Sequence, residues 1–252
     1  MIKIGSNIIN PDRLINEYSP GSIEQKTIEI LSTSSEVYEY DSINQLKFEL
    51  NLRMNIVKAA VELNNSDFSF RTFRKSQCNP EYWTRTDEGG FLIKEDVKPF
   101  DAINDILVNS SKYGTECATA IVIVYYLALA RVFPEKLFNE MFPDLYLMNW
   151  KSLDEDLGIY TDREPKDYLP GDCRYFKNPD VDPLTPEWQG ENVIDLGNGT
   201  YYGHGIGIEN AEGIITALNR HRMSDEAESA HLMDSVIRPS FKYLSYKYYF
   251  SI

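Results

Sequence analysis

Cysteines are the most reactive side chains in this sequence of 252 residues, and one of its three has an unusual setting. Cys117 follows residues 113–116 (Tyr-Gly-Thr-Glu) and opens the apolar run 118–130. The run is too long for a typical strand and ends before Pro134, so we predict a mostly buried helix beginning near Cys117. The N–H groups of a first turn lack intrahelical partners, and the helix dipole favours negative charge. Both effects favour the thiolate, which is the attacking form of cysteine.

The alternative for Cys117 is a small buried cysteine without a chemical role, which is common among apolar neighbours. Cys78 lies in a polar loop and Cys173 follows the turn 170–172, so we interpret both as structural. An odd number of cysteines without CxxC spacing predicts free thiols in a reducing compartment.

A cysteine nucleophile needs a proton acceptor, and a predicted hairpin offers two candidates. A two-residue turn at 198–199 (Asn-Gly) would pair Val193 with His204 and Glu191 with Ile206. Residues two apart share a face, so Glu191 and His204 would point the same way, toward the thiol if that face packs on the helix. A change of one residue in loop length would break this relation. Taken alone, the glutamate reads as a solvated strand end and the histidine as a core residue.

Other motifs that carry chemistry are missing from the sequence. His221 and His231 lie among charged residues, and we expect both to be exposed. The histidine spacing gives no zinc signature, and the acidic stretch 154–156 lacks the order of a calcium-binding loop. No glycine-rich phosphate-binding or dinucleotide-binding motif is present.

The elements that would position these residues form a mixed α+β pattern without internal repeats. We expect residues 151–190 to be mostly loop, with a short strand over 173–176, and the chain to close with a tyrosine-rich strand. A second hairpin is predicted over 82–95, around residues 87–90. Predicted helices begin at Ser22, at Asp41 or Ser42, near Ala102 and at Cys117, and two more span 211–222 and 225–236.

Composition limits the classes of partner. Apolar residues make up 42% and charged residues 25%, which suits one globular domain. A formal net charge of −14 repels phosphate backbones and anionic lipids, so we expect neither nucleic acid nor membrane as a partner. The longest apolar run is shorter than a membrane span, and no secretory signal is visible. We therefore expect a cytoplasmic protein.

Several segments resemble one known family, the small bacterial spore-coat transglutaminases of the Bacillus type (protein-glutamine gamma-glutamyltransferases). The similarity runs from about residue 40 to 220 in the same order, and it is weak in the first forty residues, around 154–156 and in the C-terminal tail. The matching segments are FELNLRMNIVKAA (48–60), ECATAIVIVYYLAL (116–129), GDCRYFKNP (171–179), WQGENVI (188–194) and HGIGI (204–208).

The resemblance implies a fold and an activity. The fold would be a single transglutaminase domain over 1–252, with a helical part at about 1–65 and a catalytic core at about 66–252. That core would be papain-like, as in bacterial cell-wall thiol hydrolases, with an antiparallel sheet and surrounding helices. The activity would be the formation of isopeptide crosslinks between protein glutamine and lysine side chains through a cysteine thioester.

The resemblance also assigns the site residues. Cys117 matches the nucleophile, Glu191 the principal catalytic carboxylate and Glu116 a second, partly redundant one. A glutamate acts as a base near neutral pH only if burial or a like charge raises its pKa. Four further positions match those lining a substrate tunnel: Phe70, Trp150, Trp188 and His204.

The family resemblance implies no cofactor, no metal, no calcium requirement and no propeptide. The expected partners are spore-coat proteins that supply glutamines and lysines, and the expected form is a monomer. Its location would be the mother-cell cytoplasm and later the spore coat. Two alternatives stay open at this point, a thiol amidase or hydrolase on the same scaffold and a non-catalytic coat component.

Overall fold

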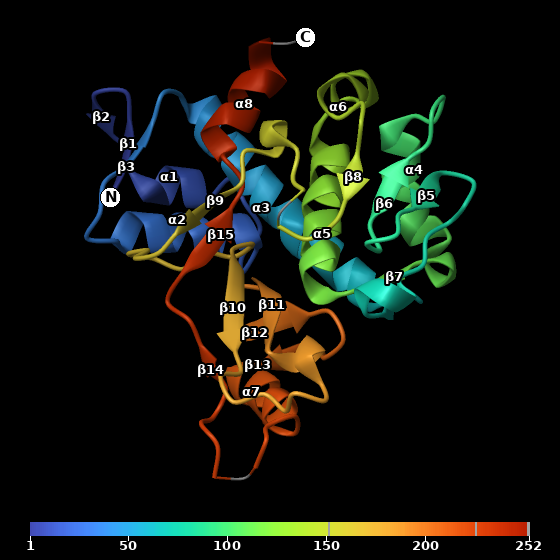
Figure 1. Ribbon diagram of the computed structural model, residues 1–252. Coiled ribbons are helices and arrows are strands. Elements are labelled where there is room, and N and C mark those ends of the chain that lie inside the picture. The colour runs from blue at the N-terminus through green and yellow to red at the C-terminus, as the bar shows by residue number, and fades with distance from the viewer. Residues whose placement is uncertain (151, 225, 251–252) are drawn as a thin grey trace.

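The computed structural model describes residues 1–150, 152–224 and 226–250, and two long helices, α3 (Ile43–Asn64) and α5 (Cys117–Val132), pack against each other at its centre (Figure 1). Ser42 caps α3 by accepting a hydrogen bond from the Gln45 N–H at 3.2 Å. The helix starts at Cys117 and Ile43, as well as the end at Asn64, confirm the predictions.

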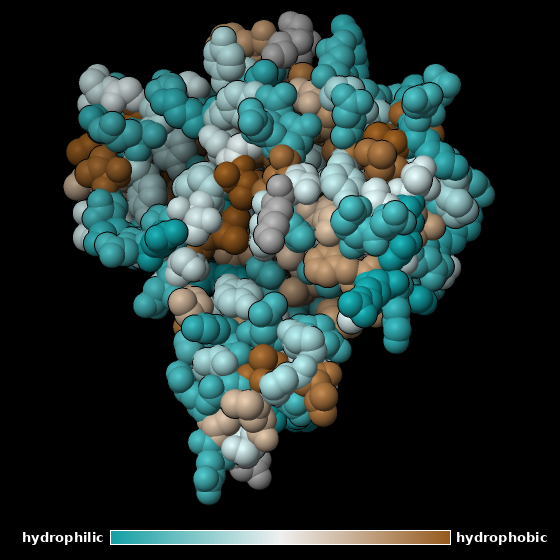
Figure 2. Space-filling model, in the orientation of Figure 1, coloured by the Kyte–Doolittle hydropathy of each residue, from teal (hydrophilic) through white to brown (hydrophobic). Residues whose placement is uncertain are grey.

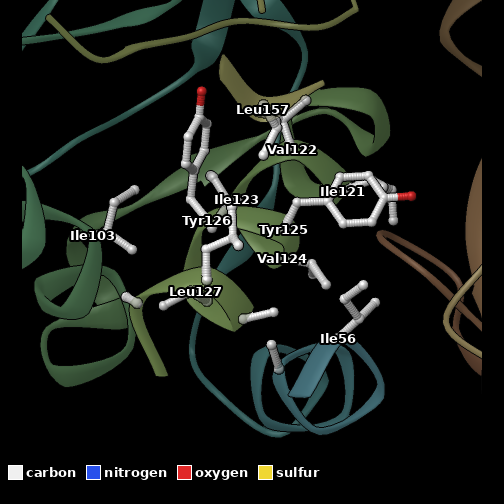
Figure 3. Close-up of a cluster of buried hydrophobic side chains, with 14 of the residues drawn as sticks. Ile56, Ile103, Ile121, Val122, Ile123, Val124, Tyr125, Tyr126, Leu127 and Leu157 are labelled. Atoms are coloured by element: carbon white, nitrogen blue, oxygen red, sulfur yellow. The ribbon is translucent and has the colours of Figure 1, made fainter. Parts of the chain in front are cut away.

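Helix α5 is buried on all sides. All of its residues from Cys117 to Ala130 are buried. Figure 3 shows its side chains meeting Ile56 of α3, Ile103 of α4 (Pro99–Val108) and Leu157 on different sides of the helix. Burying each large aliphatic side chain is worth about 1.5–3 kcal/mol, so this contact shell fixes where the helix and its first residue lie.

An antiparallel sheet packs on one side of α5 and lies below it in Figure 1. Alternate residues of its central strand serve two cores, because Ile194 faces the α5 side while Val193 packs with helix α7 (Ala211–Asn219). Its strand order in the described residues is β13-β12-β11-β10-β15-β9, with β14 also pairing β10. The strands are β9 (Tyr160–Asp162), β10 (Cys173–Lys177), β11 (Gly190–Asp195), β12 (Thr200–Gly203), β13 (Gly207–Asn210), β14 (His231–Leu232) and β15 (Val236–Arg238).

Smaller elements surround this centre. A second core cluster holds the N-terminal part together and includes Ile28 and Leu31 of α2, which Ser22 caps as predicted. The elements of this part are β1 (Ile2–Ile4), β2 (Asn7–Ile8), α1 (Pro11–Ile15), α2 (Ile23–Thr33) and β3 (Tyr38–Tyr40). On the other side of α5 lie β4 (Ser69–Phe70), β5 (Trp83–Arg85), β6 (Phe91–Ile93), β7 (Gly114–Thr115), α6 (Glu135–Met141) and β8 (Tyr146–Leu147). The antiparallel pairing of β5 with β6 confirms the hairpin predicted over 82–95.

Two predictions for the C-terminal part are wrong. The expected final strand is a helix, α8 (Phe241–Phe250), and residues 251–252 lie outside the described residues. Its Tyr248 ring lies 5.6 Å from the ring of Phe48 and 6.2 Å from that of Phe133, between centroids. Packing against these rings of the main core therefore overrides the strand preference of tyrosine.

The helix predicted over 225–236 is also wrong. Residue 225 lies outside the described residues, and the segment after it contributes β14 and β15 to the sheet. The reason is tertiary pairing, because β15 fits between β10 and β9 and buries Val236.

The hairpin around Asn198 forms with a different register. Asp195 pairs with Tyr201 and Val193 with Gly203, because the loop has three residues, 197–199, instead of two. Gly197 and Gly199 adopt left-handed φ angles of 72° and 82°, which glycine alone adopts without strain. The predicted pairing of Val193 with His204 is therefore wrong by one residue, and with it the shared face of Glu191 and His204.

The strand after the turn, which was expected to pair Ile206 with Glu191, ends before residues 204–206 and is followed by a separate strand, giving β12 and β13. The mixed α+β class with an antiparallel sheet and surrounding helices is confirmed. Among the described residues, no helix has the length and apolar character to span a bilayer.

Candidate active site

Cys117 is the first residue of α5 and lies in the wall of a cavity of about 720 Å³. Its side chain is buried apart from the part that faces this cavity, with 9% of the residue exposed. Figure 2 shows the molecule from the side of Figure 1, where polar residues dominate and apolar ones form separate patches. The cavity is lined by Phe70, Thr72, Phe73, Arg74, Glu116, Cys117, Ala118, Asn149, Tyr175, Pro186, Glu187, Gln189, Gly190 and Asn192.

Glu116 caps the helix that carries the nucleophile candidate. Its carboxylate accepts hydrogen bonds from the N–H groups of Ala118 at 2.6 Å and Thr119 at 2.7 Å, and from the Thr119 hydroxyl. The cap uses two of the first-turn donors and leaves the Cys117 N–H without an acceptor in the described residues. Glu116 therefore fixes the orientation of the helix start and brings a negative charge close to the sulfur.

The thiol is more basic than the sequence suggested. Burial raises the pKa of Cys117 well above its usual value, and the carboxyl groups of Glu191 and Glu116 raise it further. A hydrogen bond from Asn192 Nδ2 to Sγ at 3.5 Å opposes this effect without cancelling it. Desolvation and the neighbouring carboxyl groups thus act against the effect expected of the helix start. The resting group is a thiol that needs a base.

Glu191 lies on β11 and is 1% exposed. Burial raises its pKa well above the usual range, and the charge of Glu116 adds to this, while the Cys117 side chain and the His204 backbone N–H act in the opposite direction. Its Oε1 has no hydrogen-bond partner in the described residues. A buried carboxylate with a raised pKa and a free lone pair beside a thiol is suited to proton exchange.

Gly203 makes room for this carboxylate. A Cβ at this position would lie 3.0 Å from Glu191 Cγ and 3.2 Å from Oε1, closer than side chains normally approach. The glycine of β12 thus permits the glutamate to fold over the neighbouring strand. Sequence reasoning missed it.

Asn192 is a further site residue that the sequence analysis did not single out. Its Nδ2 donates to Cys117 Sγ, and its Oδ1 accepts from Trp150 Nε1 at 3.2 Å. Asn192 therefore links the thiol to the indole. Its place directly after Glu191 in the Gly-Glu-Asn segment was the available signal.

His204 is not brought to the thiol. Its Nδ1 lies 3.0 Å from the Tyr202 hydroxyl and its Nε2 lies 3.3 Å from the Ser69 carbonyl oxygen, so both ring nitrogens have partners. Burial lowers its pKa to about 4, and the ring is neutral near pH 7. The ring packs 4.8 Å from Phe68 and 6.0 Å from Phe70. The register shift of the hairpin explains why it faces these rings.

Aromatic rings form a stack beside the cavity. Phe70 lines the cavity and stacks on Trp188 at 5.5 Å, and Trp188 stacks in turn on His221 at 4.4 Å. His221, expected to be exposed, is half-buried in this stack, and His231, expected to be exposed on a helix, is half-buried on β14. The stack provides an apolar wall at the side of the thiol.

A second cavity of about 380 Å³ adjoins the first, and the two share Tyr175 and Asn192. Trp150 and Cys173 line the second cavity but not the first. The four residues matched to tunnel positions therefore lie in different places. Phe70 lines the first cavity and Trp150 the second. Trp188 belongs to the aromatic stack, and His204 packs behind Phe70.

The remaining thiols do not line the cavity of Cys117. Cys173 is buried in β10, and burial raises its pKa, while Cys78 is half-buried and its pKa is raised to about 11. In the described part of the chain, no three His, Cys, Asp or Glu side chains cluster so as to hold a metal ion. The site thus offers a thiol, a buried base, an amide donor and an aromatic wall, which suits acyl transfer.

Comparison with known proteins gives consistent results. A family model described as protein-glutamine gamma-glutamyltransferase matches residues 1–249. Proteins of that name from Bacillus cereus (strain 03BB102) and Bacillus anthracis (strain CDC 684 / NRRL 3495) are 46% and 45% identical over 247 residues, covering 98% of this chain and 88% of theirs. A solved transglutaminase from Geobacillus stearothermophilus, without its C-terminal extension, is 52% identical with a TM-score of 0.77, and the match covers 81% of this chain and 97% of that one.

Proposed function

The chain belongs to the protein-glutamine gamma-glutamyltransferase family, and from this premise we propose that it crosslinks proteins through a thioester formed on Cys117. The observation that carries the proposal is a buried thiol and a buried carboxylate with a raised pKa, Cys117 and Glu191, on facing elements beside a cavity. The geometry favours Glu191 as the base over His204, whose ring nitrogens are both engaged.

In the first step, Cys117 Sγ attacks the carboxamide carbon of a protein glutamine, and its proton passes to Glu191. The carbonyl oxygen becomes an oxyanion. The Cys117 N–H and the Asn192 side-chain amide are the donors available to it, because Glu116 occupies the N–H groups of Ala118 and Thr119. Glu191 then returns the proton to the nitrogen, the C–N bond breaks, and ammonia leaves a thioester.

In the second step, the ε-amine of a lysine attacks the thioester carbon, and Glu191 accepts a proton from it. The C–S bond breaks, Cys117 regains a proton, and an isopeptide remains. We assign Glu116 the role of capping the helix and raising the pKa of Glu191, and its charge makes it the carboxylate that would partly replace Glu191.

Amine transfer competes with hydrolysis, and the aromatic residues favour the amine. Phe70 and Trp188 limit water on one side of the thiol, and Trp150 lies on the side of the second cavity. We propose that these residues, with His204 supporting Phe70, form a narrow passage that admits a lysine chain and keeps the thioester dry.

The test is incorporation of a fluorescent primary amine into a glutamine-containing protein, measured by gel fluorescence. We expect Cys117→Ala to lose at least about 10³-fold in rate, since no other group supplies the nucleophile. Cys78→Ala is the matched control, because that thiol lines neither of the two cavities. Equal incorporation by the protein and Cys117→Ala would refute the thioester.

The same assay separates the rival functions. Release of ammonia without amine incorporation would identify a thiol amidase on this scaffold. Neither ammonia nor incorporation, with unchanged coat crosslinking in cells that carry Cys117→Ala, would identify a non-catalytic coat component.

The resemblance to spore-coat enzymes supports a finer proposal. Its substrates would be coat proteins, and the enzyme would act as a monomer that moves from the mother-cell cytoplasm to the spore coat, without calcium. A nucleophile at the start of a helix that packs on an antiparallel sheet supports a papain-like core at about 66–252, with residues 1–65 as its helical flank. Crosslinking in the presence of a calcium chelator tests the calcium independence.

A further inference from the structure

The protein is strongly acidic overall, but the lining of the Cys117 cavity combines one basic residue, Arg74, with two acidic ones, Glu116 and Glu187. Residues 68–80 carry Arg71, Arg74 and Lys75 and no Asp or Glu, in a chain whose formal net charge is −14. Charges farther than about 8 Å are screened at physiological ionic strength, so the local charges decide what the cavity mouth attracts.

Arg74 is the member of this basic segment that lines the cavity. It is exposed, and in the described part of the chain no carboxylate lies within salt-bridge distance of it, of Arg71 or of Lys75. Asp87 and Glu88 in the neighbouring hairpin turn are exposed and make no ion pair with it. Within the described residues, the guanidinium is thus left without an ion-pair partner.

The backbone that carries Arg74 is held in place. Arg85 donates from NH2 to the carbonyl oxygens of Phe73 at 2.8 Å and Arg74 at 3.1 Å, and from Nε to that of Ser76 at 2.9 Å. Gly89 packs against the same segment, since a Cβ there would lie 2.2 Å from the Phe73 carbonyl oxygen. The backbone that carries the positive charge of Arg74 is therefore fixed at the side of the cavity.

A second part of the cavity lining carries the opposite charge. Glu187 lines the same cavity and is exposed, and it lies in a segment, 180–187, that also contains Asp180 and Asp182 and no Lys or Arg. A segment that crosses the mouth therefore meets a cation on the Arg74 side and anions on the Glu187 side.

Building on the proposed function, we propose that the glutamine donor carries an acidic side chain within a few residues of the reactive glutamine, and that this acid pairs with Arg74. Arg74 is then a determinant of donor specificity. Arginine suits the role because its planar guanidinium binds a carboxylate through two parallel hydrogen bonds. Glu187 sets the direction of the segment by repelling the acid from its own part of the lining.

The test compares three short peptides with one glutamine each, flanked by two glutamates, two serines or two arginines. Lysine is left out because it would act as an acceptor. With a fluorescent primary amine as acceptor at low ionic strength, we expect kcat/KM to be about threefold to fivefold higher for the glutamate peptide than for the serine peptide, as for an exposed charge pair. About 0.5 M salt should remove most of this difference.

Variants assign the preference to one residue. Arg74→Ala should abolish it and Arg74→Glu should reverse it in favour of the arginine peptide. Lys75→Ala, the matched loss of one charge from the same segment outside the cavity lining, should keep it. A preference lost equally in Arg74→Ala and Lys75→Ala, or equal rates for all three peptides, would overturn this inference alone. No incorporation from any peptide would overturn the proposed function and this inference with it.

Discussion

Two buried carboxylates at the adjacent strands β10 and β11 have opposite surroundings, because one is paired with arginines and the other has no cation beside it. Asp172, directly before β10, accepts hydrogen bonds from Arg53 at 2.9 Å, from Arg238 at 2.7 and 2.6 Å, and from the Leu169 N–H at 2.8 Å. Glu191, on β11, has no Lys or Arg partner in the described residues, and among the same residues its Oε1 has no hydrogen-bond partner.

Burial does not account for the difference, since Asp172 is 0% and Glu191 1% exposed. Burial acts to raise the pKa of Asp172, but Arg53 and Arg238 outweigh it, and the pKa is lowered. The pKa of Glu191 is raised because burial and Glu116 act with no cation to oppose them. A compensated acid stays ionised and fixes structure, whereas an uncompensated one can exchange a proton.

The largest expected effect is the loss of activity in Glu191→Gln. Removing the general base should lower the rate of amine incorporation by about 10²- to 10⁴-fold, because the thiol with a raised pKa then lacks an acceptor. Stability should be unchanged or higher, since an uncompensated buried charge is removed. Single-turnover thioester formation and urea unfolding measure the two quantities. Among alanine variants, Glu191→Ala should lose more activity than Glu116→Ala or His204→Ala, and a more severe His204→Ala would restore a cysteine–histidine mechanism.

Asp172→Asn should do the reverse. Breaking a buried ion pair leaves two buried arginines undercompensated, and we expect the free energy of unfolding to fall by about 3–5 kcal/mol. The folded fraction should keep its pH profile of activity, because Asp172 does not line the cavity of Cys117. If both variants lost stability equally, the contrast between the two acids would not hold.

His204 is a third buried titratable group, and it tests how much stability is lost when a buried group has no opposite charge beside it. The pKa of His204 is lowered from 6.5 to about 4 by burial. Between these pH values the unfolded chain binds a proton that the folded chain does not, so stability falls as pH falls, by about 2–3 kcal/mol from pH 7 to pH 4.5. Urea unfolding at both pH values measures the loss. His204→Asn should show a shallower pH dependence, and an equal slope in both proteins would contradict the assignment.

The smallest effect concerns the carboxylate that acts through Glu191. In Glu116→Gln the single amide oxygen replaces only one of the two carboxylate oxygens that accept from the helix N–H groups, so we expect a stability loss of about 1 kcal/mol. Removing the charge should move the acid limb of the pH–rate profile to lower pH, because Glu116 raises the pKa of Glu191. A limb that does not move would show that the two carboxyl groups are not coupled.

Local sequence signals predicted where three helices begin, and one of them is α5, which carries the nucleophile candidate. The caps at Ser22 and Ser42 were visible because a short polar side chain before an apolar periodicity satisfies first-turn N–H groups. The start of α5 at Cys117 was visible because an unbroken apolar run of that length suits a buried helix.

Features set by tertiary contacts were not predictable. The register of β11 and β12 depends on one extra loop residue at 197, which turned His204 away from Glu191. The aromatic segment 241–250 became a helix because Tyr248 packs on rings far away in the sequence. The direction of the Cys117 pKa shift follows from desolvation by its neighbours, which no local pattern reports.

Strand β15 completes the sheet late, because it lies between two strands that precede it in the sequence. Residues 236–238 insert between β10 and β9, and Arg238 supplies half of the arginine clamp on Asp172. The sheet behind the thiol therefore stays incomplete until residues 236–238 have been translated. A chain that lacks residues 236–238 would lack both this strand and one of the two arginines that pair with Asp172, so the sheet and the ion pair are completed together.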